Sequence, residues 1–300
     1  MVIDVVTYNG ERDMWDIRYN ILKDYVDEFI VVEFDKTFSG KDKPWYFMEV
    51  REGEEYKYKN KNVVYCQCTE PYYEKYYEEA RKSPNTQYGK GADHWIREWA
   101  QKEVIKDCLA DLNKTPEFNI EDDDIVFIGD ADEIWNPEMF LPKWKIPTDK
   151  KTLTKLKLKV YTYWLNNRSN EEFWGIMSGF YKDIKGECLN HLRTNAIKTL
   201  DEWGWHFTSM GGPEALKKKL QDSYTKESYA TKEVIDNLEQ NIKNNKDFLG
   251  RDFTYRIDES EWPEYLKKNK KKYRKLCYPS LSSHKGVASI QKELEPNFYK

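Results

Sequence analysis

Residues 1–33 carry a strand pattern, a helix pattern and a second strand pattern in that order, and this succession limits the fold more than any other feature. Residues 2–8 and 29–33 are apolar and rich in β-branched side chains, whereas apolar residues recur at helical spacing over 14–25. Two strands joined by a crossover helix lie parallel in one sheet. We therefore expect an α/β fold whose ligands bind beyond the carboxyl ends of the strands.

The rest of the chain extends this pattern. Apolar runs predict strands at 63–68 and 125–128, an alternating segment predicts an antiparallel strand at 154–164, and helical spacing predicts helices at 72–82, 94–112, 214–220 and 230–242. No internal repeat or low-complexity segment is present. We expect a single domain over residues 1–300, built on a mixed, mostly parallel central sheet flanked by helices.

Charge and composition restrict the class of partner. Lys plus Arg number 49 and Asp plus Glu number 53, so the formal net charge is −4 and no basic field attracts nucleic acid. The 22 Tyr and 11 Trp supply flat faces that suit stacking against sugar rings, although most of them must form the core. The lysines at 267, 268 and 270–272 form either a solvated helix face or a local anion-binding patch.

The cysteines and the start of the sequence bear on the compartment. Five cysteines are an odd number for a disulfide framework, and Cys66 and Cys68, which share one face of a predicted strand, have no second pair nearby to complete a zinc site. The sequence shows neither a signal peptide at its start nor a run of about 18 apolar residues, the length that would span a membrane. These features predict a soluble, cytoplasmic protein without a transmembrane segment, with reduced thiols.

Two acids follow the predicted strand at 125–128. Asp130 and Asp132 stand where a buried strand opens into its loop, and carboxylates so placed can share a hard cation. Mn²⁺ or Mg²⁺ at this point would clamp a diphosphate and stabilise it as a leaving group. Gly129 lets a ligand approach the backbone closely, and Glu133 could orient the two acids.

The same pattern has other interpretations. Asp-rich strand ends often form turns and helix caps. Phosphatases of the haloacid dehalogenase type also place Asp-x-Asp after an apolar strand, and Asp130 would then be the nucleophile. A non-catalytic carbohydrate-binding protein would account for the aromatic residues but needs no paired acids behind a parallel strand.

Longer blocks of sequence add a resemblance to glycosyltransferase family 17. The blocks occur in order at residues 8–18, 32–41, 95–98, 123–134 and 204–212, with a weaker match at 262–265. The resemblance spans most of residues 1–220. It implies a GT-A type nucleotide-sugar-binding fold, a UDP-sugar donor that we expect to be UDP-GlcNAc, and transfer with inversion to an oligosaccharide or glycoprotein acceptor. Residues 1–135 would then bind the nucleotide sugar, 136–222 would face the acceptor, and 223–300 would form a helical, lysine-rich C-terminal part.

Within this frame several residues receive expected roles. His206, followed by Gly211, Gly212 and Lys217, is similar to the segment that completes the metal shell in other GT-A transferases; otherwise it packs between its aromatic neighbours. Inversion needs a carboxylate to accept the acceptor's proton, and Asp201 and Glu202 are the candidates. The expected donor-binding residues are Asn9, Glu11, Arg18, Glu33, Lys36, Arg97, Asp130, Arg193 and Lys217, and the expected acceptor platform is Trp164, Trp174 and Trp205. Glu11 and Arg18 could instead form a structural ion pair.

Overall fold

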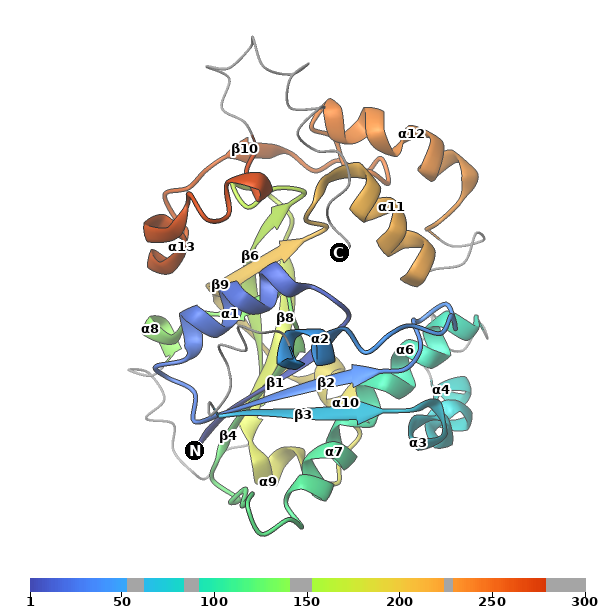
Figure 1. Cartoon of the computed structure of the whole chain (residues 1–300), viewed down its shortest axis with the longest axis vertical. Coiled ribbons are helices and arrows are strands. Elements are labelled where there is room, and N and C mark those ends of the chain that lie inside the picture. The colour runs from blue at the N-terminus through green and yellow to red at the C-terminus, as the bar shows by residue number, and fades with distance from the viewer. Residues whose placement is uncertain (53–61, 84–91, 141–152, 224–228, 279–300) are drawn as a thin grey trace.

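A computed structural model describes residues 1–52, 62–83, 92–140, 153–223 and 229–278. These residues form one β-sheet flanked by helices (Figure 1). The strands are β1 (Val2–Tyr8), β2 (Glu28–Phe34), β3 (Val63–Cys68), β4 (Ile125–Asp130), β5 (Glu133–Trp135), β6 (Thr154–Thr162), β7 (Asn167–Ser169), β8 (Phe173–Phe180), β9 (Ile197–Thr208) and β10 (Tyr255–Ile257). The α-helices are α1 (Arg12–Leu22), α2 (Tyr46–Glu52), α3 (Glu70–Tyr73), α4 (Tyr77–Lys82), α6 (Asp93–Glu103), α7 (Ile105–Leu112), α8 (Pro137–Phe140), α9 (Tyr181–Ile184), α10 (Leu189–Asn195), α11 (Gly212–Ser223), α12 (Lys232–Lys243) and α13 (Glu264–Asn269), with short 3₁₀ turns η1 (Glu74–Tyr76) and η3 (Arg274–Leu276).

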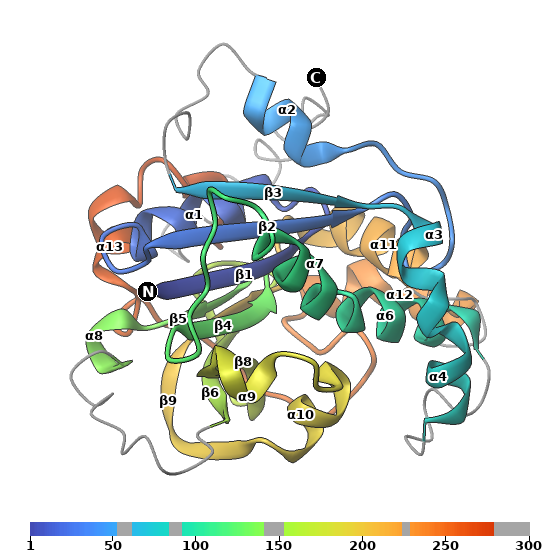
Figure 2. The ribbon, with the colours of Figure 1, turned by 90° about the horizontal axis from the view of Figure 1, so that it is seen from below.

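The sheet is mixed, and its N-terminal half is parallel. The strand order is β10-β7-β6-β8-β4-β1-β2-β3, in which β3, β2, β1 and β4 run parallel (Figure 2). Strand β8 is antiparallel to both β4 and β6, and β6 pairs in parallel with β9. The predicted β-α-β unit is therefore confirmed as β1, α1 and β2, and the segment at 154–164 is confirmed as a strand antiparallel to its neighbour β8.

Two hydrophobic cores hold helices on the opposite faces of the sheet. One face packs Trp15 and Ile17 of α1 and Leu266 of α13 against the strands. The other face packs Ala100 of α6 and Leu109 of α7. Figures 1 and 2 show the two sets of helices on the two sides of the strands. Each helix buries one apolar stripe against the sheet, which is why helical periodicity identified these segments.

Some predicted elements differ in extent. The helix expected at 94–112 is two helices, because Val104 ends α6 and precedes α7. The segment at 72–82 comprises α3, η1 and α4 in succession. Strands β8 and β9 were not predicted; the first residues of β9 are exposed and polar and lack the apolar pattern of a buried strand.

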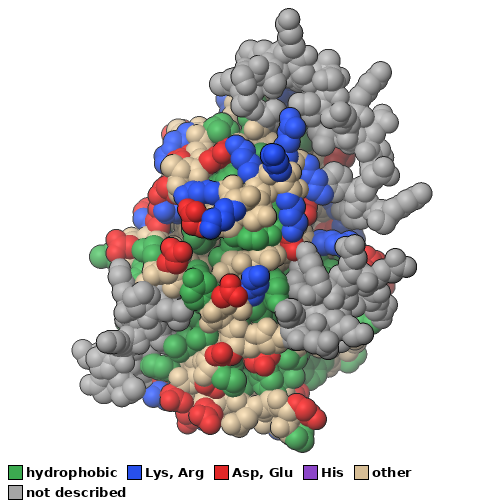
Figure 3. All heavy atoms as spheres, turned by 60° about the vertical axis from the view of Figure 1, so that its left-hand side comes forward, with side chains coloured by type: hydrophobic (Ala, Val, Ile, Leu, Met, Phe, Trp, Pro, Cys, Tyr) green, Lys and Arg blue, Asp and Glu red, His purple; other side chains and the backbone are tan. Residues whose placement is uncertain are grey.

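The lysine-rich segment lies on the outer surface of α13 and the turn after it. The lysines at 267, 268 and 270–272 are exposed, and basic side chains gather over the upper part of the face in Figure 3. Lys267 pairs with Glu264, and Lys270 pairs with Glu259. These lysines are therefore exposed to solvent, as a solvated helix face requires. Within the described residues, no helix is long and apolar enough to cross a membrane.

Candidate nucleotide-sugar site

A pocket opens at the carboxyl ends of β1, β2 and β4, where the parallel sheet was expected to bind its ligand. Its lining comes from these strand ends, from the loops after β1, β2 and β4, and from helices α6 and α11. The lining residues are Thr7, Tyr8, Asn9, Glu11, Phe34, Lys36, Thr37, Phe38, Lys43, Gln101, Lys102, Asp130, Asp132, Lys219, Asp222 and Ser223. Five residues proposed from the sequence therefore share one pocket: Asn9, Glu11, Lys36, Asp130 and Asp132.

Asp130 is the last residue of β4, and its side chain remains 39% exposed. The Thr7 hydroxyl of the neighbouring strand β1 donates a 2.7 Å hydrogen bond to Asp130 Oδ1. Lys102 Nζ of α6 lies 4.0 Å from Asp130 Oδ2. Desolvation raises the pKa of Asp130, but the charges of Lys102 and Arg193 and the Thr7 bond outweigh it and hold that pKa below its ordinary value. Asp130 is therefore an anion in the pocket.

Asp132 and His206 meet because β5 pairs with β9. Glu133 lies opposite His206 in this antiparallel ladder, and the Phe207 amide donates to the Asp132 carbonyl at 2.9 Å. His206 Nε2 is 3.7 Å from Asp132 Oδ1. A Cβ on Gly204 would stand 2.2 Å from the carbonyl oxygen of Ile134, so only glycine permits this close approach of the two strands.

The donor atoms around Asp132 suit a divalent cation. Asp132 Oδ1 and His206 Nε2 are close enough to bind one ion, and His206 Nδ1 is buried without a hydrogen-bond partner in the described part of the chain. Burial lowers the pKa of His206, which favours the neutral imidazole that ligates metal. No cluster of three or more His, Cys, Asp or Glu arranged for a metal occurs among the described residues. A cation here would therefore depend on the ligand for further oxygen atoms.

Glu133 is a buried acid that holds the backbone of Asp130 in place. Its side chain is almost fully buried, and its Oε2 accepts a hydrogen bond from the Asp130 amide at 3.2 Å. Burial and the charge of Asp130 raise the pKa of Glu133 to about 7. A Cβ on Gly175 of β8 would lie 2.7 Å from the Glu133 carboxyl carbon, so the glycine leaves room for this carboxyl group.

Glu33 and Arg97 shape the pocket from outside its lining. Glu33 is buried at the end of β2 and accepts bonds from the Lys43 ammonium, the amides of Tyr46 and Phe47, and the Tyr65 hydroxyl. Arg97 Nη1 of α6 donates to the Phe38 carbonyl at 2.7 Å. Both side chains fix the loop that carries the lining residues 36–38 and Lys43, and neither lines the pocket itself.

Arg18 lies in the core beneath the site. Its Nε and Nη2 atoms each donate to an oxygen of Asp4 at 2.7 Å, and both side chains are fully buried. Its Nη1 atom donates to the backbone carbonyls of Asp130, at 3.1 Å, and of Glu133. The structural ion pair considered for Arg18 therefore exists, but its partner is Asp4 and not Glu11. Arg18 braces the loop that presents the two acids.

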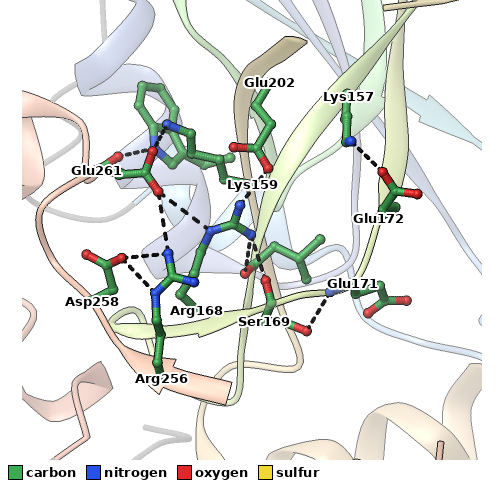
Figure 4. A network of polar contacts seen from close by, with 12 residues as sticks. Lys157, Lys159, Arg168, Ser169, Glu171, Glu172, Glu202, Arg256, Asp258 and Glu261 are labelled. Atoms are coloured by element: carbon green, nitrogen blue, oxygen red, sulfur yellow. Dashed lines mark hydrogen bonds and ion pairs between the residues drawn. The ribbon is translucent and has the colours of Figure 1, made fainter. Parts of the chain in front are cut away.

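Asp201 and Glu202, the expected general bases, lie outside the pocket lining. Asp201 is exposed, and Glu202 accepts a 2.5 Å hydrogen bond from Arg168 Nη2. Figure 4 shows Arg168 between Glu202 and Glu261, whose carboxylate also pairs with Lys159. Four residues of an extended strand span about 13 Å, so a short separation from His206 in sequence is not a short distance in space.

The three tryptophans lie in different surroundings. Trp205 is 6% exposed, and its indole donates to the Glu261 carbonyl at 2.7 Å, so burial rather than sugar stacking explains it. Trp174 is half-buried, with Lys198 Nζ 4.6 Å from its ring centroid. Trp164 packs against Gly212 at the start of α11. None of the three lines the pocket.

Several pocket residues were missed in the sequence. Lys219 Nζ lies 3.7 Å from Asp132 Oδ2, whereas the predicted Lys217 of the same helix lies outside the lining. Lys219, Asp222 and Ser223 share one face of α11, since Leu216 and Leu220 face the core. That helical spacing was a usable signal. Arg193 of α10 also lies outside the lining, although its charge acts on Asp130.

Comparisons with known proteins identify relatives of this chain and its family. Beta-1,4-mannosyl-glycoprotein 4-beta-N-acetylglucosaminyltransferase of Homo sapiens is 29% identical over 133 residues, which are 44% of this chain, and the Mus musculus protein is 28% identical over the same length. The matched part is 21% of those relatives' own length. The match to the solved structure of the inositol-1-phosphate CTP transferase of T. maritima covers 75% of this chain and 98% of that protein's chain, at 10% identity. Its TM-score of 0.31 is too low to support any argument. The profile of glycosyltransferase family 17 matches residues 1–210, and the chain therefore belongs to that family.

Proposed function

We propose that this chain is an inverting glycosyltransferase of GT-A type that transfers N-acetylglucosamine from UDP-GlcNAc to an oligosaccharide or glycoprotein acceptor. The observation that carries the proposal is that Asp130, at the end of β4, and Asp132, just after it, both line the pocket at the ends of β1 and β2. The strand order β3-β2-β1-β4-β8-β6 supports the GT-A type. The names of the mammalian relatives support the sugar and a glycoprotein acceptor.

The pocket's own charges suit a nucleoside diphosphate. Four lysines line the same pocket as the two acids, and two of them, Lys102 and Lys219, lie within 4.0 Å of an acid oxygen. The four lysines are Lys36, Lys43, Lys102 and Lys219. Cations in a site that partly excludes water interact strongly with phosphate oxygens, because the local dielectric is low. We assign Lys219 the contact expected of Lys217, because Lys219 lines the pocket.

We further propose that Mn²⁺ or Mg²⁺ binds between Asp132 and His206. Their two donor atoms are 3.7 Å apart, and the imidazole has an unpartnered second nitrogen. When bound, the cation would offset charge that develops on the departing diphosphate. Asp130 would stay ionised opposite it, held by Thr7 and Lys102. Asp201→Asn and Glu202→Gln test which carboxylate is the general base, since the variant that lacks the proton acceptor should abolish transfer.

The test compares UDP binding and transfer in wild type, Asp132→Asn and a matched control. Asp252→Asn is the control because Asp252 is exposed on a loop away from the pocket lining. We expect UDP with Mn²⁺ to raise the melting temperature of wild type and of the control, whereas Asp132→Asn should lose the metal-dependent shift and at least about 100-fold in UDP release from UDP-GlcNAc. Full activity in Asp132→Asn, or after chelation of all metal, would refute the proposal. Release of phosphate with an acyl-phosphate on Asp130 would indicate the phosphatase, and metal-independent sugar binding without UDP would indicate a carbohydrate-binding protein.

A further inference from the structure

A second group of cations lies near Asp130 but outside the pocket lining. Lys155 is in β6 and Lys198 is in β9, and the two are Cα partners in the parallel ladder. Side chains at paired positions share a face of the sheet, and the charge of Lys198 acts on Lys155. Like charges at paired positions are destabilising unless an anion compensates them. This arrangement calls for a counterion.

Arg193 of α10 approaches the same group. The buried Glu103 of α6 accepts hydrogen bonds from the amides of Leu189 and Asn190 at 3.1 Å and from the Asn190 side chain at 2.8 Å. These bonds fix the first turn of α10 on α6. Arg193 follows one turn later, and its charge acts on four neighbours of the cluster: Lys102, Asp130, Glu133 and Lys155.

Positive charge exceeds negative charge at this point. In the part of the chain that the structure describes, neither the Arg193 side chain nor the Lys155 side chain forms a hydrogen bond or an ion pair within 4 Å. Burial and the neighbouring Arg193 lower the pKa of Lys155 to about 8, and the charge of Glu133 offsets them only in part. The guanidinium fork of a half-buried arginine matches a carboxylate or a phosphate in two parallel hydrogen bonds.

We propose that Arg193 and Lys155 bind an anionic group of the acceptor, either a carboxylate or a phosphate, next to the donor pocket. This inference rests on the proposed transferase function and names the acceptor as an acidic glycan. The donor's diphosphate is the other candidate anion, but Arg193 and Lys155 do not line the pocket. They come from β6 and α10, in the half of the chain that the family resemblance assigns to the acceptor. Trp174 adjoins the cluster, because Lys198 Nζ lies 4.6 Å from its ring centroid.

The test measures binding of three small sugars to the full chain by calorimetry, with UDP and Mn²⁺ present. The probes are methyl glucoside, methyl glucuronide and glucose 6-phosphate, which differ in charge and in the kind of anion. We expect at least one anionic sugar to bind about tenfold or more tightly than methyl glucoside. The better of the two identifies carboxylate or phosphate as the preferred group. Equal affinities for all three sugars would overturn the proposal.

Variants separate the acceptor site from the donor site. Arg193→Gln should abolish the preference for the anionic sugar and leave the affinity for UDP within about twofold, whereas Arg193→Lys should restore part of the preference. Arg81→Gln is the matched control, since Arg81 is an exposed arginine of α4 that pairs with Glu78 of the same helix. If Arg193→Gln weakens UDP as much as the sugar, the cluster serves the donor and the inference fails. If wild type binds no UDP, the proposed function itself fails, and the two failures are thereby distinguished.

Discussion

Removal of the Arg18 guanidinium should destabilise the fold strongly without removing any atom from the pocket lining. In Arg18→Met, Asp4 would stay buried with only the Trp135 indole, 3.0 Å away, as a hydrogen-bond donor from a side chain. Breaking one partner of a fully buried pair costs about 3–5 kcal/mol, because the remaining charge is uncompensated. The carbonyls of Asp130 and Glu133 would also lose a donor, which adds to the loss.

Urea unfolding followed by tryptophan fluorescence and by circular dichroism measures this loss. The double variant Arg18→Met with Asp4→Asn removes both charges and should be about 1–3 kcal/mol more stable than the sum of the two single losses predicts. If Arg18 contacted the donor instead, Arg18→Met would unfold at the wild-type urea concentration and lose only UDP affinity. A loss of unfolding free energy below about 1 kcal/mol in Arg18→Met would contradict the reasoning.

Three more outcomes follow from particular contacts. Gly204→Ala should lower the unfolding free energy by about 2 kcal/mol or more and abolish metal-dependent UDP binding, because its Cβ would lie 2.2 Å from the Ile134 carbonyl oxygen. A rise in melting temperature with UDP and Mn²⁺ equal to that of wild type would contradict this. The folded-state pKa of Lys155, about 8, lies below the ordinary 10.5, so the unfolded state binds more protons between these two pH values. Urea titrations should therefore find that wild type gains unfolding free energy relative to Lys155→Met as the pH rises from 8 to 10.5. A difference that does not change with pH would argue against this reasoning. The buried sulfur atoms of Cys68 and Cys108 are 3.3 Å apart, so refolding with oxidised glutathione should form a disulfide between them while the glutathione is reduced to two thiols. Peptide mass analysis should detect the linked peptides. Alkylation of both cysteines after this treatment would contradict the prediction.

The fold was predictable where the pattern is local. Strand β1 has the predicted bounds Val2–Tyr8, because an unbroken apolar run between polar loops can form little else than a buried strand. Asp130 at the end of β4 and Asp132 just after it were predictable for the same reason, since the apolar run ends where the loop begins. Strand β9 was not predictable, because its first residues are exposed and its pairing with β6 joins segments about 40 residues apart.

The roles of charged residues depended on contacts that sequence spacing does not reveal. Arg18 belongs to an amphipathic helix, and only the packing of α1 on the sheet brings it against Asp4 of β1. Glu33 lies near the end of an apolar strand and was expected to bind the nucleotide sugar. Its carboxylate instead accepts four hydrogen bonds, from Lys43, Tyr46, Phe47 and Tyr65. His206 reaches Asp132 only through the ladder between β5 and β9. In each case a distant partner decides whether the side chain supports the site or lines it.

The two kinds of charge in the site are held with different rigidity, and this difference has a functional consequence. Asp130 and Asp132 stand at strand ends that are fixed by Thr7, by Arg18 and by the β5–β9 ladder. Lys219, in contrast, has a long side chain on α11 that is 46% exposed and lies 3.7 Å from Asp132 Oδ2. The acids are therefore preorganised, whereas this lysine can adjust to the bound phosphate. Changes beneath the acids should lower stability and transfer together, but a change at Lys219 should weaken donor binding and leave the unfolding free energy nearly unchanged.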